Sequence, residues 1–166
     1  IRDNLGDWSS DVCSSDLAIG QGEVLASPIQ MALVASTIAN DGVLMKPHLV
    51  SEVLNPSGDS VKKIKNEVVN TVTTVENAKL VKKYMKDTVS RGTAGAAAVD
   101  SIAVCGKTGT ADTGRSGEKP HSWFIGFAPY ENPQVAVAVI VENGGVGGGI
   151  STEIAGKVIR EALREK

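Results

Sequence analysis

The residues of this chain best suited to chemistry are four consecutive ones, Lys107-Thr108-Gly109-Thr110, which follow an apolar stretch that we expect to be a strand. A lysine supplies a positive field for a carboxylate, or for an oxyanion that develops during a reaction. The hydroxyls of Thr108 and Thr110 can hydrogen-bond the same carboxylate. Gly109 leaves the strand edge open to an extended ligand, and the amide of Thr110 is suited to be one of two oxyanion-hole donors. The tetrapeptide alone is weak evidence, because any solvated strand end could carry it.

Three strands and a helix are expected to hold this tetrapeptide in place. Apolar runs bounded by turn residues predict an antiparallel meander, and an amphipathic helix follows to cover it. The predicted strands span residues 101–110, 122–130 and 134–141, and the helix spans residues 150–165.

Two further helices and a hairpin are predicted before the meander. Ser27-Pro28 is typical of a helix start and Asn40-Asp41-Gly42 of a helix end. Thr74 is expected to cap a second helix that runs to about Val89, and the turn Asn55-Pro56-Ser57-Gly58 predicts a small exposed hairpin between the two. The apolar positions that indicate these helices recur at helical spacing: Ile29, Leu33, Val34, Thr37 and Ile38 in the first, and Val75, Ala78, Val81, Met85 and Val89 in the second.

The composition is that of one globular domain. The chain has 166 residues, of which 42% are hydrophobic and 22% charged, so wholesale disorder is excluded. A net charge of −2 and 4% aromatic residues offer no basic patch or stacking platform for nucleic acid. The longest apolar run, residues 135–141, is too short for a membrane span, and the N-terminus shows no signal-peptide pattern. Cys13 and Cys105 form neither a disulfide framework nor a zinc motif, and we predict no metal site and no cofactor.

Residues 7–17, DWSSDVCSSDL, stand apart from the rest of the sequence. They are rich in serine and aspartate and show neither a helical nor a strand period. All eleven residues match one reading frame of a common short-read sequencing adapter. We therefore expect residues 1–17 to be an artefact or an unlinked segment, in which Trp8 and Cys13 have no biological role. The alternative is a surface loop.

Residues 18–166 resemble the C-terminal portion of the transpeptidase domain of class B penicillin-binding proteins. Lys-Thr-Gly is one of three signature elements of penicillin-binding proteins and serine β-lactamases, beside Ser-x-x-Lys and Ser-x-Asn. Further stretches match the family in the same order along the chain: AIGQGEVLASPIQ at 18–30, IANDGVLMKPHLV at 38–50, RGTA at 91–94, WFIGFAP at 123–129 and VENGG at 141–145.

The resemblance implies an α/β fold of the serine β-lactamase/D,D-transpeptidase type, truncated to the later sheet strands and the helices packed on them. It also implies a parent protein that is a peptidoglycan D,D-transpeptidase, active in cell shape or cell division, in which a serine attacks the penultimate D-Ala carbonyl and β-lactams acylate the same serine. The implied ligands are β-lactams and stem peptides ending in D-Ala-D-Ala, bound by Lys107, Thr108, Gly109 and Thr110, with Lys107 and the Thr110 amide also catalytic. The implied location is the extracytoplasmic face of the bacterial cell membrane, with an N-terminal anchor absent here and a membrane-embedded glycosyltransferase as partner.

The implied mechanism lacks its nucleophile in this chain. The segment Ser60-Val61-Lys62-Lys63 matches Ser-x-x-Lys, but it lies on the predicted hairpin and follows Gly20-Gln21-Gly22, whereas the family's serine precedes that segment. Ser-x-Asp sequences at 9–11 and 14–16 imitate the remaining motif only inside the suspected adapter. We therefore expect this chain to be catalytically inert and poorly stable.

Three alternatives remain open: a β-lactam-sensing receptor domain, a serine β-lactamase and a non-catalytic scaffold of the division machinery. The Gly-Gln-Gly segment and the Phe-Ala-Pro ending at 127–129 favour the transpeptidase over the first two. An intact Ser-x-x-Lys upstream would argue against the third.

Other features receive structural interpretations. The glycine-rich stretch at 144–149 fits neither the dinucleotide-binding nor the P-loop spacing, so we predict a flexible strand-to-helix connection. His121 is predicted to be a local hydrogen-bond partner, and Cys105 a small apolar filler on a buried strand. Trp123 and Phe124 are predicted to belong to the core and the cleft wall.

Overall fold

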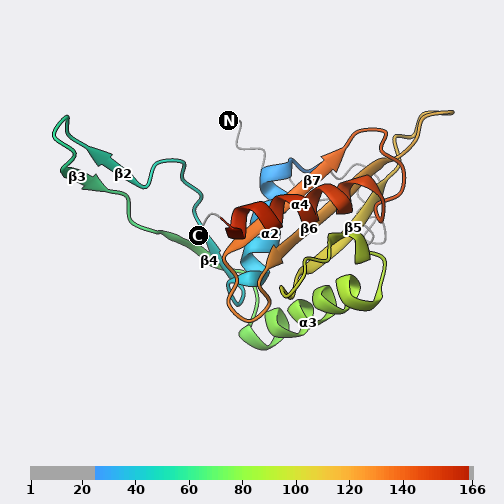
Figure 1. Cartoon of the computed structure of the whole chain (residues 1–166), viewed down its shortest axis with the longest axis horizontal. Helices are drawn as coiled ribbons and strands as arrows, with labels where there is room; N and C mark the ends of the chain where they lie inside the picture. The colour runs from blue at the N-terminus through green and yellow to red at the C-terminus, as the bar shows by residue number, and fades with distance from the viewer. Residues whose placement is uncertain (1–24, 165–166) are drawn as a thin grey trace, which may run out of the picture.

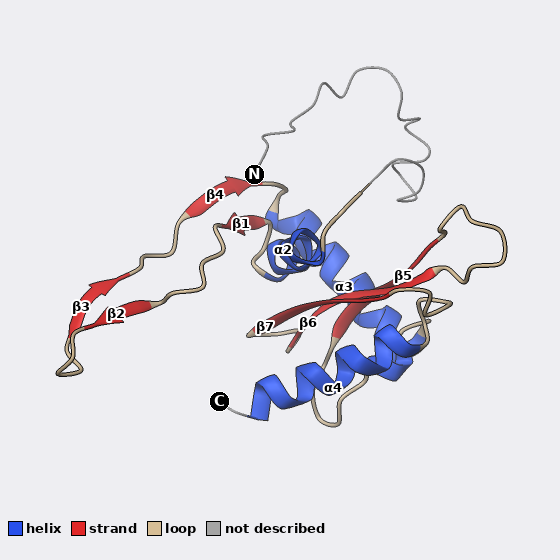
Figure 2. Cartoon of the chain, turned by 90° about the horizontal axis from the view of Figure 1, so that it is seen from above, coloured by secondary structure: helices blue, strands red, loops and turns tan. Residues whose placement is uncertain are grey.

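The computed structural model describes residues 25–164, and its body is a three-stranded sheet with helices on both sides. Helices α2 and α4 lie on opposite faces of this sheet (Figure 2), and α3 lies along β5. A long arm of paired strands projects from the body (Figure 1). No helix within residues 25–164 combines the length and the apolar character needed to cross a membrane. The helices are α2 (Pro28–Ala39), α3 (Val75–Arg91), the 3-10 helix η1 (Gly95–Ala97) and α4 (Ile150–Arg164); the strands are β1 (Val43–Met45), β2 (Glu52–Leu54), β3 (Ser60–Lys63), β4 (Val68–Thr71), β5 (Cys105–Ala111), β6 (His121–Ala128) and β7 (Val135–Val141).

The body sheet has the order β5-β6-β7, and both pairs are antiparallel, so the predicted meander is confirmed. The register places Lys107 opposite Ile125 and Thr108 opposite Phe124. Because side chains alternate across a strand, odd-numbered residues of β5 and β6 point toward α2 and α3, which we call the α2/α3 face. Even-numbered residues point to the other side, the α4 face.

The α4 face carries the larger core. Phe124 is fully buried there against α4 and the segment around η1. The other buried members of this cluster are Val89, Ala94, Ala97, Val99, Val104, Ala128, Val137, Ala155 and Ile159. The α2/α3 face carries a smaller cluster of Met85, Cys105 and Phe127, with Ile38 and Tyr130 packed beside it.

Helix α2 begins and ends as predicted. The Ser27 hydroxyl accepts a hydrogen bond from the Gln30 amide, and the Gln30 side chain accepts one from the Ser27 amide in return, which forms a capping box. At the other end, Asp41 and Gly42 adopt positive φ values of 51° and 91°. Gly42 is required there, because a Cβ would overlap the Thr73 carbonyl oxygen.

Helix α3 begins after the predicted cap Thr74, but the burial of its apolar stripe differs from expectation. Ala78, Met85 and Val89 are buried, whereas Val75 and Val81 remain exposed. The sequence analysis missed Lys82, which is buried at 8% exposure because its ammonium donates to the Ala39 carbonyl at the end of α2. A nearby carboxylate, Asp41, accepts from the same ammonium at 3.4 Å.

The arm consists of two short antiparallel pairs, β1 with β4 and β2 with β3. The predicted hairpin around Asn55 is confirmed as β2–β3, and the Asn55 side chain accepts from the amides of Ser57 and Asp59 in its turn. Strand β4 was not predicted, because all four of its residues are exposed and no hydrophobic alternation marks it.

The predicted bounds of two body strands need correction. The first was expected from residue 101, but β5 starts at Cys105, because Ser101 adopts a positive φ of 63° in a turn closed by a bridge between Val99 and Ile102. The second was expected to reach Tyr130, but β6 ends at Ala128, since Pro129 has no N–H for the ladder.

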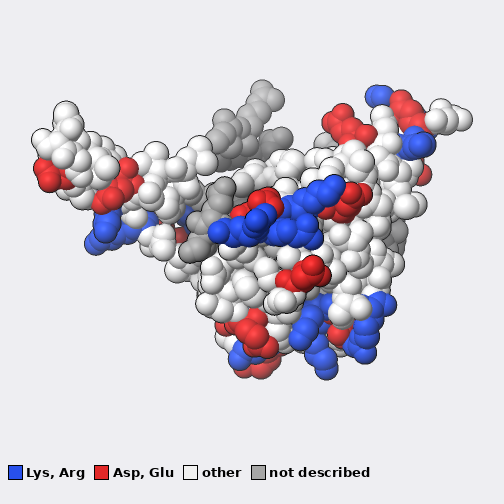
Figure 3. Space-filling view, viewed as in Figure 1, with Lys and Arg blue, Asp and Glu red and all other residues white. Residues whose placement is uncertain are grey.

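The surface of α4 interleaves opposite charges. Ion pairs join Lys157 to Glu153 at 2.7 Å and Arg164 to Glu161 at 3.1 Å. Figure 3 shows basic and acidic side chains side by side over this helix. Such exposed pairs contribute little to stability.

Candidate functional site

The tetrapeptide predicted to do chemistry lies on β5, which forms one edge of the described body sheet. Strand alternation divides its four side chains between the two faces. Lys107 and Gly109 belong to the α2/α3 face, and Thr108 and Thr110 to the α4 face. A ligand along this edge would therefore meet the lysine from one side of the strand and the hydroxyls from the other.

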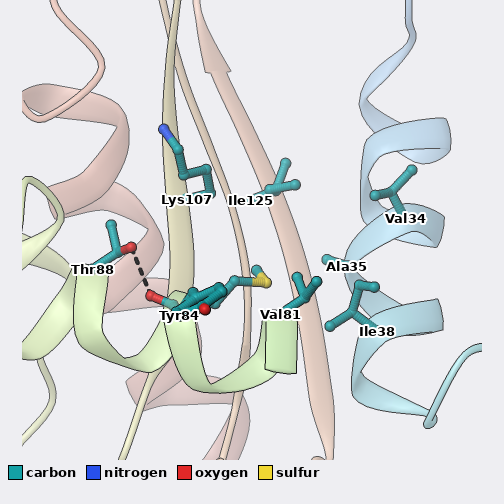
Figure 4. A pocket seen from close by; sticks show the side chains of 9 residues that line it. Val34, Ala35, Ile38, Val81, Tyr84, Thr88, Lys107 and Ile125 are labelled. Carbon is teal, nitrogen blue, oxygen red and sulfur yellow. Dashed lines mark hydrogen bonds between the residues drawn. The ribbon is translucent and has the colours of Figure 1, made fainter. Parts of the chain in front are cut away.

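Lys107 stands at a groove between α2 and α3. Its side chain is exposed, and the ammonium donates to the carbonyl of Thr108 at 2.7 Å. Figure 4 shows Lys107 and Ile125 between the two helices, with Val34 and Ile38 facing Val81 across the groove. The groove has a volume of about 310 Å³, and we call it the α2–α3 groove; its lining is Val34, Ala35, Ile38, Val81, Tyr84, Met85, Thr88, Lys107 and Ile125. Among the described residues of this largely apolar lining, Lys107 alone carries an ammonium.

Thr108 is held by a residue from the segment before β5. The hydroxyls of Thr108 and Thr93 lie 3.1 Å apart. Thr93 belongs to the Arg-Gly-Thr-Ala stretch, which the sequence analysis used only as a point of resemblance. The structure thus adds Thr93 to the candidate site.

Thr110 is held from the glycine-rich connection between β7 and α4. The amide of Gly147 donates to the Thr110 hydroxyl at 3.0 Å. The Gly147 backbone lies so close to β5 that a Cβ there would overlap the Gly109 carbonyl oxygen. A glycine at 147 is therefore required by the close approach of the two backbones.

The space beside Gly109 is needed within the protein. A Cβ at Gly109 would lie 3.1 Å from the Cβ of Trp123, its partner in the register. The sequence analysis assigned the missing side chain to ligand approach. The structure supplies a second reason, the close contact with Trp123.

The connection at residues 144–149 joins β7 to α4, as predicted, and its amides are hydrogen-bonded within the protein. Besides Gly147, the amides of Gly144, Gly145 and Gly149 donate to the carbonyls of Val141, Pro120 and Val146. Because these amides are occupied within the protein, they do not cradle a phosphate.

Cys105 and His121 take the structural roles expected of them. Cys105 is fully buried, and burial raises the pKa of its thiol to about 12, against a smaller lowering by the positive charges of Lys82 and Lys86. The ring Nδ1 of His121 accepts a hydrogen bond from the Asn143 amide at 3.0 Å. Phe124 lies in the core, as predicted.

Both Ser-x-x-Lys sequences of the chain lie on exposed segments outside the helices. Ser60 to Lys63 form β3, which is exposed throughout and lies at the far end of the arm from β5 (Figures 1 and 2). A second match, Ser116 to Lys119, escaped the sequence analysis; it lies in the exposed β5–β6 loop. The Ser-x-Asp sequences and the Gly-Gln-Gly segment fall outside the described residues. In the described part of the chain, no group of three or more histidine, cysteine, aspartate or glutamate residues could hold a metal ion.

Comparison with known proteins decides the family. The sequence model of one protein family, described as the penicillin binding protein transpeptidase domain, matches residues 3–160 of this chain. This chain belongs to the penicillin-binding protein transpeptidase family. The resemblance stated from sequence is thus confirmed.

Individual relatives agree with this family. The chain is 36% identical over 155 residues to the peptidoglycan D,D-transpeptidase PbpA of Mycolicibacterium smegmatis, a match that covers 89% of this chain and 31% of that protein. Among solved structures, the D,D-transpeptidase domain of a peptidoglycan glycosyltransferase from Eggerthella lenta is 37% identical with a TM-score of 0.77, over 84% of this chain and 32% of that one. Penicillin-binding protein A of M. tuberculosis, solved as a ceftriaxone acyl-enzyme complex, is 33% identical with a TM-score of 0.80, over 88% and 34%. The expected α/β transpeptidase fold is confirmed, and the chain spans about a third of these relatives' length.

Proposed function

We propose that this chain supplies the Lys107–Thr110 strand of a serine D,D-transpeptidase that cross-links peptidoglycan stem peptides ending in D-Ala-D-Ala. The observation that carries the proposal is the edge strand itself, with an exposed lysine on one face and two anchored threonines on the other. The family match and the relatives named as D,D-transpeptidases support it. The acyl-enzyme complex of one relative supports β-lactams as ligands of the same site.

In the proposed reaction, a serine from a part of the parent outside this chain attacks the penultimate D-Ala carbonyl. The bond to the terminal D-Ala nitrogen breaks, a proton passes to that leaving amine, and an ester to the serine remains. An acceptor amine from a neighbouring stem peptide then attacks the ester and regenerates the serine. Lys107 and the Thr110 amide stabilise negative charge on the carbonyl oxygen or the terminal carboxylate, and the hydroxyls of Thr108 and Thr110 orient that carboxylate.

The parent is proposed to act at the extracytoplasmic face of the cell membrane, held by an N-terminal anchor and paired with a membrane-embedded glycosyltransferase.

Residues 1–17 are proposed to be the adapter-derived or unlinked segment. Resequencing the source locus with a different adapter tests this. Loss of the DWSSDVCSSDL codons and an upstream frame with Ser-x-x-Lys and Ser-x-Asn would support an active parent, whereas a persistent segment behind a start codon would contradict it.

The test of function is covalent labelling by a fluorescent penicillin. The full-length parent is expected to be labelled, and the 166-residue chain is not. Lys107→Ala in the parent is expected to slow labelling about 100-fold, as loss of one transition-state donor does. Lys119→Ala, an exposed lysine in the adjacent loop, is the matched control and should label normally, as should Ser60→Ala. Labelling of the short chain, or an unchanged rate for Lys107→Ala, would contradict the proposal.

A further inference from the structure

A buried network of hydroxyl groups lies directly behind the Thr110 end of β5. The carbonyl of Gly147 accepts a hydrogen bond from Thr152 Oγ1 at 2.6 Å, and Ser151 Oγ lies 3.3 Å from the same oxygen. The amide of the same residue donates to Thr110. Gly147 is therefore a single backbone unit that joins the first turn of α4 to the candidate site.

The network extends to the neighbouring strand. Ser122 Oγ lies 2.7 Å from Ser151 Oγ and donates to the carbonyl of Val146 at 3.0 Å. Ser122 is also the register partner of Thr110. The two ends of the network thus meet at adjacent positions of β5 and β6.

All three donor side chains of this network, Ser122, Ser151 and Thr152, are fully buried. Burying a hydroxyl is unfavourable unless it is hydrogen-bonded, and each of these is bonded. Small apolar residues could fill the same space without that requirement. The hydroxyls do what apolar residues cannot, because their directional bonds fix the position of Gly147 against β5.

We propose that Thr152, assisted by Ser151, is a positioning residue for acylation, acting through Gly147 on Thr110. This inference rests on the proposed function of the tetrapeptide. Oxyanion-hole donors must lie within about 2.7–3.1 Å of the developing charge, so a small displacement of β5 at Thr110 slows the chemical step. Thr152 itself touches no ligand in this proposal.

The experiment compares two changes at Thr152 in the full-length parent. Thr152→Val keeps the shape of the side chain and removes the hydroxyl, whereas Thr152→Ser keeps the hydroxyl and removes the methyl group. Stopped-flow labelling with fluorescent penicillin separates the rate constant of acylation from the dissociation constant of the initial complex. Thr152→Val is expected to lower the acylation rate constant about tenfold, in line with the cost of a displaced group, with a smaller change in the dissociation constant. Thr152→Ser should stay within about twofold of wild type.

The matched control is Thr37→Val in α2, which removes another buried hydroxyl, one that donates to the Leu33 carbonyl of its own helix. This variant should lose a comparable amount of thermal stability and acylate at the wild-type rate. Ser151→Ala is the second variant if Thr152→Val does not fold, and it should also slow acylation.

The outcomes separate the inference from the proposed function. A wild-type parent that is never labelled contradicts both. A labelled wild type with equal rates for Thr152→Val and Thr152→Ser, or a slow Thr37→Val, contradicts the positioning role alone. A slow Thr152→Val beside a normal Thr152→Ser and a normal control supports it.

Discussion

The two faces of the body sheet differ in how far this chain covers them by itself. On the α4 face, Phe124 and Ile159 are fully buried within a continuous apolar cluster. On the α2/α3 face the cluster is small, and Val34 and Val81 beside the α2–α3 groove are 49% and 39% exposed. Figure 2 shows both faces with the sheet seen between α2 and α4.

The difference shows that the candidate site is held from one face and opens on the other. Thr108 and Thr110 are fixed from the closed α4 face by Thr93 and Gly147, while Lys107 stands in the open groove. A contiguous apolar groove is a surface that proteins usually cover or use. We expect three substitutions and one pH test to measure how differently the two faces are packed.

The largest effect is expected from Phe124→Ala on the closed face. Removing a fully buried ring costs about 3–5 kcal/mol. In a Trp8→Phe background, this should abolish the cooperative urea unfolding of the 166-residue chain that Trp123 fluorescence follows. Ile125→Ala, at the next position but in the groove, is the control and should keep the transition. Equal losses for the two variants would contradict the comparison.

A smaller loss is expected from Lys82→Met, which breaks the tie between α3 and the end of α2. The change leaves the Ala39 carbonyl without its ammonium donor, at a cost of about 1–3 kcal/mol. The measurement is the free energy of unfolding obtained from urea denaturation. Lys83→Met, a change at the exposed neighbouring residue, should lower that free energy by less than about 0.5 kcal/mol. If both variants have the same free energy of unfolding, the hydrogen bond from Lys82 to the Ala39 carbonyl does not stabilise the open face.

Cys105 provides a pH test of packing on the open face. Its pKa is raised from 9.0 to about 12 by burial, so the folded thiol keeps its proton where the unfolded thiol loses it. Stability should therefore be unaffected below pH 9 and should fall between pH 9 and 12. In a Cys13→Ser background, a thiol reagent at pH 8 should react only after urea is added. Rapid labelling of the native chain would show that this face opens.

The smallest effect is expected from Val81→Ser in the groove. Val81 is already 39% exposed, so the loss of stability should be below about 0.5 kcal/mol. Urea denaturation measures this loss in the free energy of unfolding. Val89→Ser, at a buried position of the same helix, is the contrasting variant. A loss above 2 kcal/mol would mean that the groove is covered in solution.

Prediction from sequence succeeded where the signal is local. The cap Ser27, the cap Thr74 and the turn at Asn55 each satisfy backbone groups within four residues, and each was placed correctly. Prediction from sequence failed where contacts between segments far apart in the sequence determine the burial of a residue. The burial of Lys82 was missed, because its partner Ala39 lies 43 positions away.

The sequence by itself determined the tetrapeptide, the meander that carries it and the family resemblance, because residue order and two-residue alternation are properties of the chain alone. Only the tertiary structure decided that Thr93 and Gly147 anchor Thr108 and Thr110, and that Lys107 stands at a groove between α2 and α3. It also decided the partners of the amides in the connection at residues 144–149. Gly147 meets Thr110 across 37 residues, and no local pattern encodes a hydrogen bond between segments that only the folded sheet brings together.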